Sequence, residues 1–445
     1  MQQASDTIAA IATPPGRGGV GVIRISGSAV PDLMQALLGK YLSPRKASLC
    51  KFLDESGEAI DYGIALYFRA PHSYTGEDVL ELQGHGGMMV QRLLLERCLA
   101  LGVRMADPGE FTRRAYLNDM IDLAQAESVA DLIDASTRSA ARSAVRSLQG
   151  DFSRRIQEAV SSLVELRMLV EAGLDFPEED IEPASLDEAR KRATSILKDI
   201  LSIIEAARQG VILRAGIQIA IAGKPNAGKS SLLNLLSGDE VAIVTEIPGT
   251  TRDAIRQSIE IGGIPAHIVD TAGLRESEDP VEKIGMERAR KVIGQSDLIL
   301  YIADAASGLD EEDDRILAGL PDLPRLVVMN KIDLAGFDPV VDDRSGHHTV
   351  FMSAKQGRGL DLLKEELLAM LSWHSLGEDQ FIARERHVNA LQKASQSVSR
   401  ALDTEAPEFM AEELREAQLA LSSITGEFTP DDLLGEIFSR FCIGK

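Results

Sequence analysis

Gly223-Lys224-Pro225-Asn226-Ala227-Gly228-Lys229-Ser230 matches the pattern G-x-x-x-x-G-K-[ST], which forms a phosphate-binding loop between a strand and a helix. The alternating apolar run at residues 217–222 comes directly before it and predicts the strand. In such a loop, backbone N–H groups surround the phosphates at a helix N-terminus, where the helix dipole also favours negative charge. Lys229 is expected to reach the β- and γ-phosphates, and Ser230 to supply a hydroxyl for Mg²⁺.

Three further motifs follow in the order typical of a GTP-binding domain: Asp270-Thr271-Ala272-Gly273, Asn330-Lys331-Ile332-Asp333 and Ser353-Ala354-Lys355. Asp270 ends a predicted strand, where a carboxylate can hold the Mg²⁺ shell through water. The carboxylate of Asp333 can accept hydrogen bonds from the N1–H and the exocyclic amine of guanine, a pattern that adenine does not offer. One such match can arise by chance, but four in this order predict a site for GTP with Mg²⁺.

Length and composition set the limits of the remaining inferences. A chain of 445 residues suggests about three domains. We expect a cytoplasmic protein, because the sequence has no apolar run long enough for a membrane span, no signal peptide and only three scattered cysteines. The net charge of -22 argues against nonspecific coating of nucleic acid. A local basic face remains at Arg138, Arg142 and Arg146, which is either a solvated helix face or a place where an RNA backbone lies.

The pattern along the chain predicts α/β and helical regions in alternation. Residues 1–118 are expected to form a mixed α/β domain with strands at 20–25, 63–68 and 79–83 and a helix at 88–101. Residues 119–214 are expected to be helical, with Gly210 ending the last helix, and residues 373–445 are expected to be helical again. Between them, residues 215–372 alternate strand and helix, which predicts a Ras-like domain with a mostly parallel sheet. This domain is therefore expected to be an insertion in a discontinuous helical domain.

Two details bear on GTP hydrolysis. Leu274 follows the second motif, where Ras-like enzymes have a glutamine that orients the attacking water. Glu282, in the acidic run just downstream, is the candidate to replace it, although spacing alone favours a surface carboxylate. No arginine finger is evident. The stretch 241–252 has the length and composition of a loop that covers the phosphates, and its carbonyls together with Asn226 could enclose a monovalent cation that takes the role of that arginine.

The motifs resemble those of the translation-factor-related GTPases that potassium activates, and the flanking segments narrow the resemblance to the MnmE (TrmE) family of tRNA-modification GTPases. The flanking segments that carry it span the chain: Asp6-Thr7-Ile8-Ala9-Ala10, residues 12–21, Arg24-Ile25-Ser26-Gly27, Ser73-Tyr74-Thr75-Gly76-Glu77-Asp78, Gly84-His85-Gly86-Gly87, Pro108-Gly109-Glu110-Phe111-Thr112, Asp122-Leu123-Ala124-Gln125-Ala126-Glu127 and Phe441-Cys442-Ile443-Gly444-Lys445.

The resemblance implies a homodimer joined by an N-terminal domain that binds a 5-formyl- or 5,10-methylene-tetrahydrofolate. It also implies a flavoprotein partner, MnmG (GidA), which carries FAD. With this partner, members of the family add an aminomethyl or carboxymethylaminomethyl group to C5 of the wobble uridine of certain tRNAs, using a folate one-carbon unit. The modification would accompany hydrolysis of GTP to GDP and phosphate, which is stimulated by K⁺.

By the same resemblance, individual positions acquire roles. Ser230 and Thr251 would bind Mg²⁺, whereas K⁺ would be bound by Asn226, Thr245, Ile247 and Thr250. Glu282 would orient the hydrolytic water, and Lys229 would act on the phosphates. Arg24, Glu81 and Lys445 would line the folate pocket, although from the residues alone Arg24 and Glu81 could equally form a structural ion pair. The full set expected to contact GTP is Asn226, Ala227, Gly228, Lys229, Ser230, Ser231, Thr245, Glu246, Ile247, Pro248, Gly249, Thr250, Thr251, Asp270, Thr271, Ala272, Gly273, Asn330, Lys331, Asp333, Ser353, Ala354 and Lys355.

Two positions and one alternative function qualify this prediction. Met120 stands where members of the family often have a lysine, so the folate tail would need another partner or would bind more weakly. Cys442 would lie near the folate and tRNA chemistry, and a nucleophilic role for it is a hypothesis. The alternative function is a ribosome-assembly GTPase of the Era or Der type, an RNA-binding switch, but it would leave the first 120 residues without a role.

Overall fold

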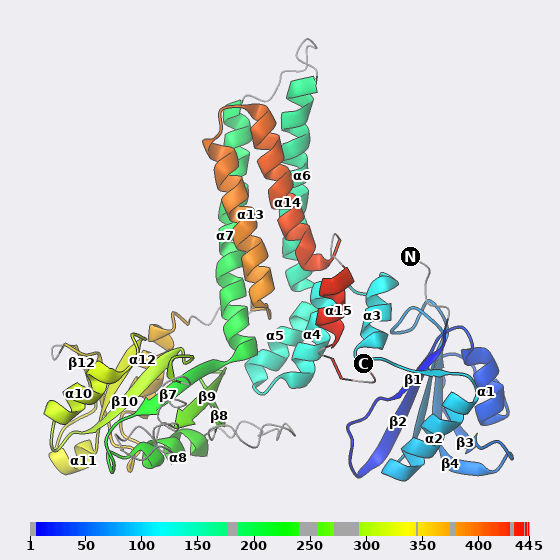
Figure 1. Cartoon of the computed structure of the whole chain (residues 1–445), viewed down its shortest axis with the longest axis horizontal. Helices are drawn as coiled ribbons and strands as arrows, with labels where there is room; N and C mark the ends of the chain where they lie inside the picture. Colours follow the sequence, from blue (N-terminus) through cyan, green and yellow to red (C-terminus); the bar gives the residue numbers. More distant parts are fainter. Residues whose placement is uncertain are drawn as a thin grey trace, which may run out of the picture. The chain divides into compact units, whose positions relative to one another are not determined.

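The computed structural model describes residues 6–175, 186–239, 256–270, 293–343, 346–373, 380–427, 431–439, 441, 442 and 444. The chain forms two compact units, each built from segments that are distant in sequence (Figure 1). The first unit comprises Met1–Ala130, Leu148–Met168 and Ala411–Lys445. The second comprises Asp131–Ser147 and Leu169–Met410.

The first unit contains a six-stranded sheet in the order β3-β4-β5-β2-β1-β6. Its strands are β1 (Ile8–Ile11), β2 (Gly18–Ser26), β3 (Ser48–Leu53), β4 (Ala59–Phe68), β5 (Val79–Gly86) and β6 (Arg104–Met105). All neighbours are antiparallel except β1 and β6. The predicted strands correspond to β2, β4 and β5, whereas β1, β3 and β6 were not anticipated. Helices α1 (Val30–Leu38) and α2 (Met88–Ala100) supply apolar side chains to the buried core on one face of this sheet.

Helices complete the first unit. They are α3 (Glu110–Leu117) and α15 (Asp431–Ser439), together with parts of α4 (Leu123–Asp134), α6 (Asp151–Asp175) and α14 (Pro407–Thr425). One face of α14 is apolar and fully buried, and it consists of Leu414, Ala417, Leu421 and Ile424. Residues from α4 and α15 form a common apolar cluster, and α15 packs on α3.

The second unit contains a seven-stranded sheet in the order β12-β13-β11-β10-β7-β9-β8. The strands are β7 (Ile217–Ala222), β8 (Arg256–Ile261), β9 (Ile264–Asp270), β10 (Leu298–Asp304), β11 (Arg325–Asn330), β12 (Val340–Asp342) and β13 (Thr349–Phe351). Pairing is parallel from β13 through β11, β10 and β7 to β9, and antiparallel at both edges. The predicted mostly parallel sheet is therefore confirmed, and β8 and β9 form a hairpin that turns at Gly262 and Gly263.

Apolar clusters cover both faces of this sheet, which explains why its central strands are continuous apolar runs. Helices α8 (Lys229–Asp239), α10 (Glu311–Gly319) and α11 (Ile332–Ala335) connect its strands, and α12 (Leu360–Met370) follows the last strand, β13. Because the sheet is parallel, the loops after β7, β10, β11 and β13 all lie at its C-terminal edge. The phosphate-binding loop and the two base-recognition motifs are among them.

The remaining helices of the second unit are α5 (Arg138–Leu148), α7 (Leu186–Ala215) and α13 (Glu385–Asp403), and α7 packs along α13. The prediction that Gly210 ends a helix was wrong, because α7 continues through it to Ala215. The glycine is needed for packing: a Cβ there would lie 2.4 Å from the carbonyl oxygen of Phe381 and 2.8 Å from the backbone nitrogen of Ala383. Among the described residues, none of the helices combines the length and the apolar character that crossing a membrane requires.

Candidate functional site

The phosphate-binding loop joins β7 to α8 and depends on two glycines. Gly223 has a φ of +136°, and a Cβ there would lie 2.1 Å from the carbonyl oxygen of Ile302 in β10. Gly228 has a φ of +102°, and its Cβ would lie 2.1 Å from the side-chain nitrogen of Asn330. Both positions therefore combine left-handed backbone with direct contact to the neighbouring strands. Between them Asn226 is left-handed as well, with a φ of 60°, a conformation that asparagine tolerates better than most residues.

The side chain of Lys229 lies over this loop. Its Nζ donates to the carbonyl oxygens of Gly223 and Lys224, at 2.7 and 2.8 Å. Ser230 and Ser231 are exposed in the first turn of α8. An ammonium group, serine hydroxyls and the N-terminal end of a helix thus lie together, which is the donor set that a triphosphate with Mg²⁺ requires. The geometry fits the predicted phosphate site.

Asn330 connects three of the four motifs. It ends β11, is 3% exposed, and its Nδ2 donates to the carbonyl oxygen of Ala227 at 2.8 Å. Its Oδ1 accepts from the backbone N–H of Ala354 at 2.9 Å. One buried amide therefore links the phosphate-binding loop to the Ser353-Ala354-Lys355 segment. Asn330 acts as a brace between loops rather than only as a contact for the base.

The carboxylate expected to recognise guanine is also held in place. Ser353 Oγ donates to Asp333 Oδ1 at 2.6 Å, and Ser353 is fully buried. Lys331, with a left-handed φ of 68°, pairs with Asp304 at 2.6 Å. The hydrogen bond from Lys331 lowers the pKa of Asp304. Sequence reasoning missed Asp304, although its position at the C-terminal end of a buried strand was a signal.

A second cluster that sequence reasoning missed holds Lys224, the residue after the first glycine of the loop. Its Nζ pairs with Asp310 and, at 2.9 Å, with Asp313. Asp310 caps α10 and accepts from its backbone, and Lys224 together with these bonds lowers the pKa of Asp310 to about 2. Burial and the 2.6 Å hydrogen bond to Asp313 raise the pKa of Tyr301. The phosphate-binding loop is thus tied to α10 as well as to β10 and β11.

The first unit contains the second predicted site. Arg24 of β2 and Glu81 of β5 are cross-strand partners, and their side chains form an ion pair of 2.9 Å. The guanidinium of Arg24 also lies 5.7 Å from the ring centre of Tyr74 and 5.8 Å from that of Phe111. Side-chain exposures of 24% for Arg24 and 15% for Glu81 leave part of the pair open to solvent. A partly open cation and carboxylate between aromatic rings suit a flat heterocycle with a carboxylate tail.

Comparison with known proteins identifies the family. The family model described as GTP-binding protein TrmE N-terminus matches residues 7–120, and the MnmE helical domain model matches residues 123–442. A tRNA modification GTPase MnmE of Nitrosomonas europaea is 56% identical over 448 residues, covering 99% of this chain and 99% of its own. The MnmE of Dechloromonas aromatica is 57% identical and covers 99% and 100%, and that of Neisseria meningitidis serogroup C is 56% identical and covers 99% of each.

The chain belongs to the MnmE family of tRNA modification GTPases. The predicted family and the predicted GTP hydrolase activity are thereby confirmed. The N-terminal and helical matches of the MnmE family also agree with a chain that combines mixed α/β and helical regions.

Several predicted site residues of this MnmE-family chain lie outside the described residues. They are Thr245, Glu246, Ile247, Pro248, Gly249, Thr250, Thr251, Thr271, Ala272, Gly273, Glu282 and Lys445. Asp270 is described as the last residue of β9, beside Ile221 of β7 in the parallel ladder. This register places Asp270 next to the strand that enters the phosphate-binding loop, as the second motif requires.

The remaining candidates are single residues at the surface. Cys442 is exposed, and its carbonyl oxygen accepts from the N–H of Gly109 at 3.3 Å, whereas Cys50 and Cys98 are buried. Arg138 and Arg142 are exposed on α5, and Lys355 is exposed after β13. Burial raises the pKa of the Cys98 thiol to about 12, so Cys98 is an inert core residue.

Proposed function

We propose that the chain is a potassium-activated GTPase that modifies the wobble uridine of certain tRNAs in the cytoplasm together with a flavoprotein partner, MnmG (GidA). The product would carry an aminomethyl or carboxymethylaminomethyl group at C5, derived from a tetrahydrofolate one-carbon unit. One observation carries the proposal. A single chain of the MnmE family contains both a phosphate-binding loop held in place by Asn330 and the partly open Arg24–Glu81 pair. The Era- or Der-type alternative gives no role to residues 7–120, the segment that matches the TrmE N-terminal model.

At the nucleotide site, the residues would divide the work as follows. Bound Mg²⁺ and K⁺ would neutralise charge that develops on the phosphates. Lys229 would leave the loop carbonyls and contact the β- and γ-phosphates. Ser230 and Thr251 would ligate Mg²⁺, and Glu282 would orient the water. K⁺ would be ligated by Asn226, Thr245, Ile247 and Thr250, and the exposed position of Asn226 is consistent with that role.

At the second site, Arg24, Glu81 and Lys445 would bind the folate. A tetrahydrofolate bound there would supply the one-carbon unit. Glu81 can accept from the amine and ring N–H groups of a pterin, because carboxylates are acceptors only, and cations suit the glutamate tail. Tyr74, which is 36% exposed, would pack on the heterocycle, whereas Phe111 is fully buried and packs against Arg24. Burial raises the pKa of the Tyr74 phenol.

We further propose four segments: an N-terminal domain (1–118), two helical segments (119–214 and 373–445) and a G domain (215–372) inserted between them. Support comes from contacts at the two places where the chain enters and leaves the G domain. Asp131, with a side chain 5% exposed, pairs with Arg214 before β7 and with Arg384 before α13, both at 2.8 Å. Gln209 of α7 donates to the carbonyl oxygen of Ser372 after α12 at 3.0 Å. The entry and exit of the α/β module are therefore fixed to the same helical frame.

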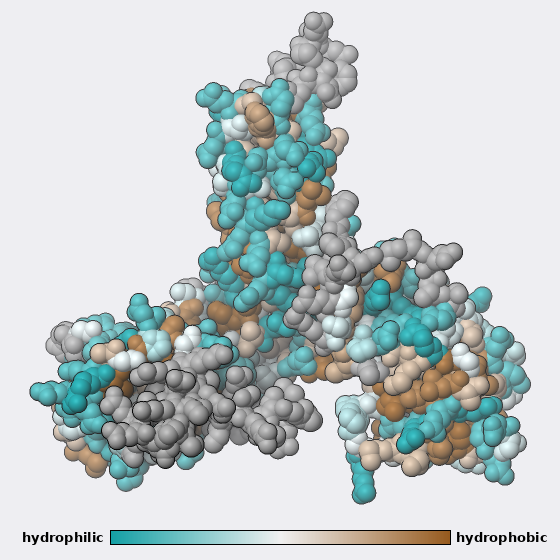
Figure 2. Space-filling model, viewed as in Figure 1, coloured by the Kyte–Doolittle hydropathy of each residue, from teal (hydrophilic) through white to brown (hydrophobic). Residues whose placement is uncertain are grey.

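A homodimer through the N-terminal domain would bury apolar side chains that are exposed in the single chain. On the outer face of β3 and β4 these are Leu49, Tyr62 and Ile64, with exposures of 76%, 55% and 41%. Met88 and Met89 at the start of α2 are 65% and 64% exposed, and apolar side chains gather over α2 in Figure 2. Leu49 and Ile64 are cross-strand partners and so lie side by side, and contiguous exposed apolar groups of this kind are typical of an association surface.

The test compares GTP hydrolysis in KCl and NaCl at equal ionic strength. We expect several-fold faster turnover in KCl, and loss of this stimulation in Asn226→Gly with GTP affinity retained. Glycine adopts a φ near +60° without strain, so this variant removes the amide oxygen while keeping the loop. Equal rates of the unchanged chain in both salts would refute the potassium site. Binding of 5-formyl-tetrahydrofolate, measured by calorimetry with Glu81→Gln as the comparison, tests the second site; no binding by the folded chain would refute it.

A further inference from the structure

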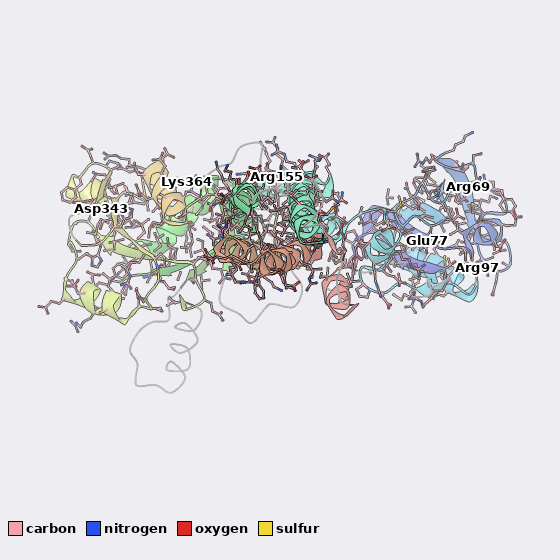
Figure 3. The ribbon with its side chains drawn as sticks, turned by 90° about the horizontal axis from the view of Figure 1, so that it is seen from above. Arg69, Glu77, Arg97, Arg155, Asp343 and Lys364 are labelled. Carbon is pink, nitrogen blue, oxygen red and sulfur yellow. The ribbon has the colours of Figure 1, made fainter. Side chains whose placement is uncertain are left out.

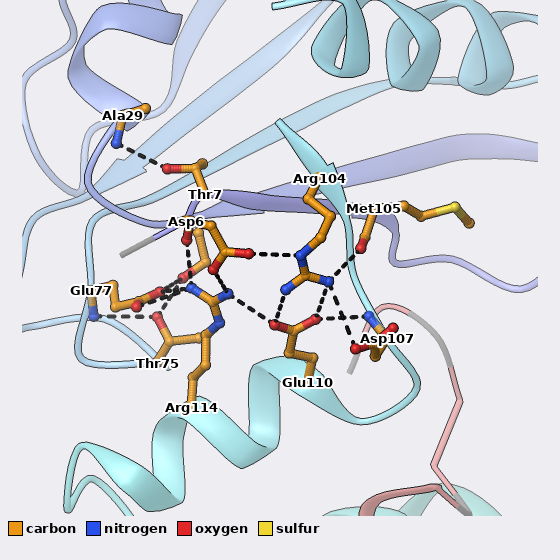
Figure 4. Close-up of polar contacts among 11 residues, drawn as sticks. Asp6, Thr7, Ala29, Thr75, Glu77, Arg104, Met105, Asp107, Glu110 and Arg114 are labelled. Carbon is orange, nitrogen blue, oxygen red and sulfur yellow. Dashed lines mark hydrogen bonds and ion pairs between the residues drawn. The ribbon is translucent and has the colours of Figure 1, made fainter. Parts of the chain in front are cut away.

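A cluster of five charged side chains joins α3 to the sheet of the first unit (Figure 4). We call it the α3 charge cluster: Asp6, Glu77, Arg104, Glu110 and Arg114. Arg114 contacts Asp6 at 2.8 Å, Glu110 at 2.9 Å and Glu77 at 3.1 Å. Arg104 of β6 contacts Glu110 at 2.5 Å and Asp6 at 2.7 Å. Every acid of the cluster is therefore paired with an arginine, and Asp6 and Glu110 each contact both.

The centre of the cluster is buried, although its outer members Arg104 and Asp6 have side chains that are 41% and 40% exposed. The side chains of Arg114 and Glu110 are only 8% and 11% exposed. Burial by itself would raise the pKa of Glu110, but hydrogen bonds from Arg104, from the backbone of Asp107 and from Arg114 outweigh it and lower that pKa. Removing one member of such a set leaves another charge buried without its partner, which is strongly destabilising. The cluster thus fixes the first turn and a half of α3.

The start of α3 also contacts the C-terminal segment, by which we mean the described residues from Gly426 to Cys442. Gly109, directly before the helix, has a φ of +68° and donates to the carbonyl oxygen of Cys442. A Cβ on Gly109 would lie 2.6 Å from the carbonyl oxygen of Phe438 and 2.9 Å from Cβ of Phe441. Farther along α3, the hydroxyl of Tyr116 donates to the carbonyl oxygen of Gly426 at 2.7 Å. Described residues near the C-terminus are therefore held against α3 by a backbone and a side-chain hydrogen bond and by the close approach at Gly109.

The same helix contacts the Arg24 strand. Phe111, two residues after Gly109, places its ring against the guanidinium of Arg24. Thr112 is hydrogen-bonded to Tyr74, the other ring beside Arg24, at 2.9 Å. Glu77 accepts from Ser26 of β2 at 2.7 Å while it pairs with Arg114, and Figure 3 shows Glu77 between the strands and α3. One short helix therefore contacts both the Arg24–Glu81 pair and the segment that carries Cys442.

We propose that Arg114 and Glu110 are positioning residues: through the α3 charge cluster they hold the first turn of α3, and thereby keep Cys442 in a fixed place relative to the Arg24–Glu81 pair. The chemical role that a fixed Cys442 would serve rests on the proposed one-carbon function, but the positioning of Cys442 does not. Neither residue contacts the substrate. Their effect passes through Gly109 to the C-terminal segment and through Phe111 to Arg24.

A spin label tests the positioning directly. Cys442 is the exposed cysteine, whereas Cys50 and Cys98 are buried, so a nitroxide reagent should label Cys442 in the full chain, with Cys442→Ser as the check on specificity. We expect an immobilised spectrum for the unchanged chain. Arg114→Met and Glu110→Gln should lose the immobilised component, and Gly109→Ala, which displaces the segment without altering any charge, should lose it too. The matched control is Arg92→Met, which breaks the exposed pair of Arg92 with Glu96 in α2 and should leave the spectrum unchanged.

Melting temperature and GTP hydrolysis are measured on the same samples. We expect GTPase turnover to be retained in Arg114→Met and Glu110→Gln. In tRNA modification, we expect a lower kcat and a nearly unchanged KM for tRNA. An immobilised label in a destabilised Glu110→Gln variant would show that the cluster is only structural and would overturn the proposal, even if Arg114→Met does not fold. Failure of the unchanged chain to bind folate would refute the second site of the proposed function but would leave the spectra, and hence the positioning, as they are.

Discussion

Replacing Gly210 with alanine is expected to destabilise the packing of α7 against the segment before α13. In most helices this change is stabilising, because alanine is favoured over glycine by about 1 kcal/mol in a helix interior. Here the added Cβ would lie 2.4 Å from the carbonyl oxygen of Phe381, 2.8 Å from the nitrogen of Ala383 and 3.2 Å from the carbonyl carbon of Ile382. All three atoms are backbone, so no rotamer change relieves the clash, and α7 or the segment before α13 must move.

The size of this effect can be isolated with a matched variant. Gly238 is the next-to-last residue of helix α8, and among the described residues a Cβ there would meet no atom within 4 Å. Gly238→Ala should therefore show the helix-propensity gain alone. Gly210→Ala should show the same gain opposed by an overpacking cost of about 1–3 kcal/mol. The difference between the two variants equals that cost, or about 2–12 °C in melting temperature at roughly 2–4 °C per kcal/mol for a domain of this size.

The assay is a thermal melt of the full chain at fixed GDP and Mg²⁺, because bound nucleotide itself raises the melting temperature. Amide hydrogen exchange gives the location: faster exchange in Gly210→Ala should appear in α7 and at residues 380–384. GTP affinity should be unchanged in both variants, since neither glycine contacts the nucleotide motifs. If Gly210→Ala melts at or above Gly238→Ala, the close approach of α7 to residues 381–383 does not constrain the fold and the reasoning is refuted.

Three further predictions concern the α/β module. Asp333→Asn should lower GTP affinity roughly 10- to 150-fold, at about 1.5–3 kcal/mol for a charge-assisted hydrogen bond, and raise affinity for xanthosine triphosphate; a fluorescent-nucleotide titration that shows an unchanged preference would contradict the role of Asp333. Asn330→Ala should also weaken GTP binding, and should in addition raise hydrogen exchange at Ala227 and Ala354, which a pure base contact would not do. Hydrogen bonds to Asp343 and Glu366 raise the pKa of His348 above its ordinary value near 6.5, so its stabilising effect is complete below that pH and is lost as pH rises through the folded value. The melting-temperature advantage of the unchanged chain over His348→Gln should therefore shrink as the pH rises above the ordinary histidine pKa of about 6.5, and a constant difference would contradict it.

Motif spacing was sufficient to predict the P-loop architecture, because a nucleotide site imposes fixed residue types on the ends of consecutive strands. The strand before the loop was predicted from its alternating apolar residues, and the mostly parallel sheet from the alternation of strand and helix over residues 215–372. Strands β1, β6 and β12 were missed because four residues or fewer do not distinguish strand from loop. Strand β3 was missed because it exposes an apolar residue, Leu49, on the face opposite the buried Cys50 and Phe52, which hides the alternation. Asp304, Asp310 and Asp313 were missed because a charged residue after a strand or before a helix is common, and only its partner gives it a role.

The order and identity of residues by themselves were enough to predict which side chains would contact phosphate, Mg²⁺ and guanine, and which family the chain resembles. These features are local, because each motif encodes its own backbone turn and its own functional groups. Only the tertiary structure decided how distant segments support them: the amide of Asn330 between three motifs, Asp131 between the two ends of the α/β module, α3 between Arg24 and Cys442, and the glycine in the middle of α7. Those contacts join residues far apart in sequence, and no local pattern specifies which buried donor will face which acceptor.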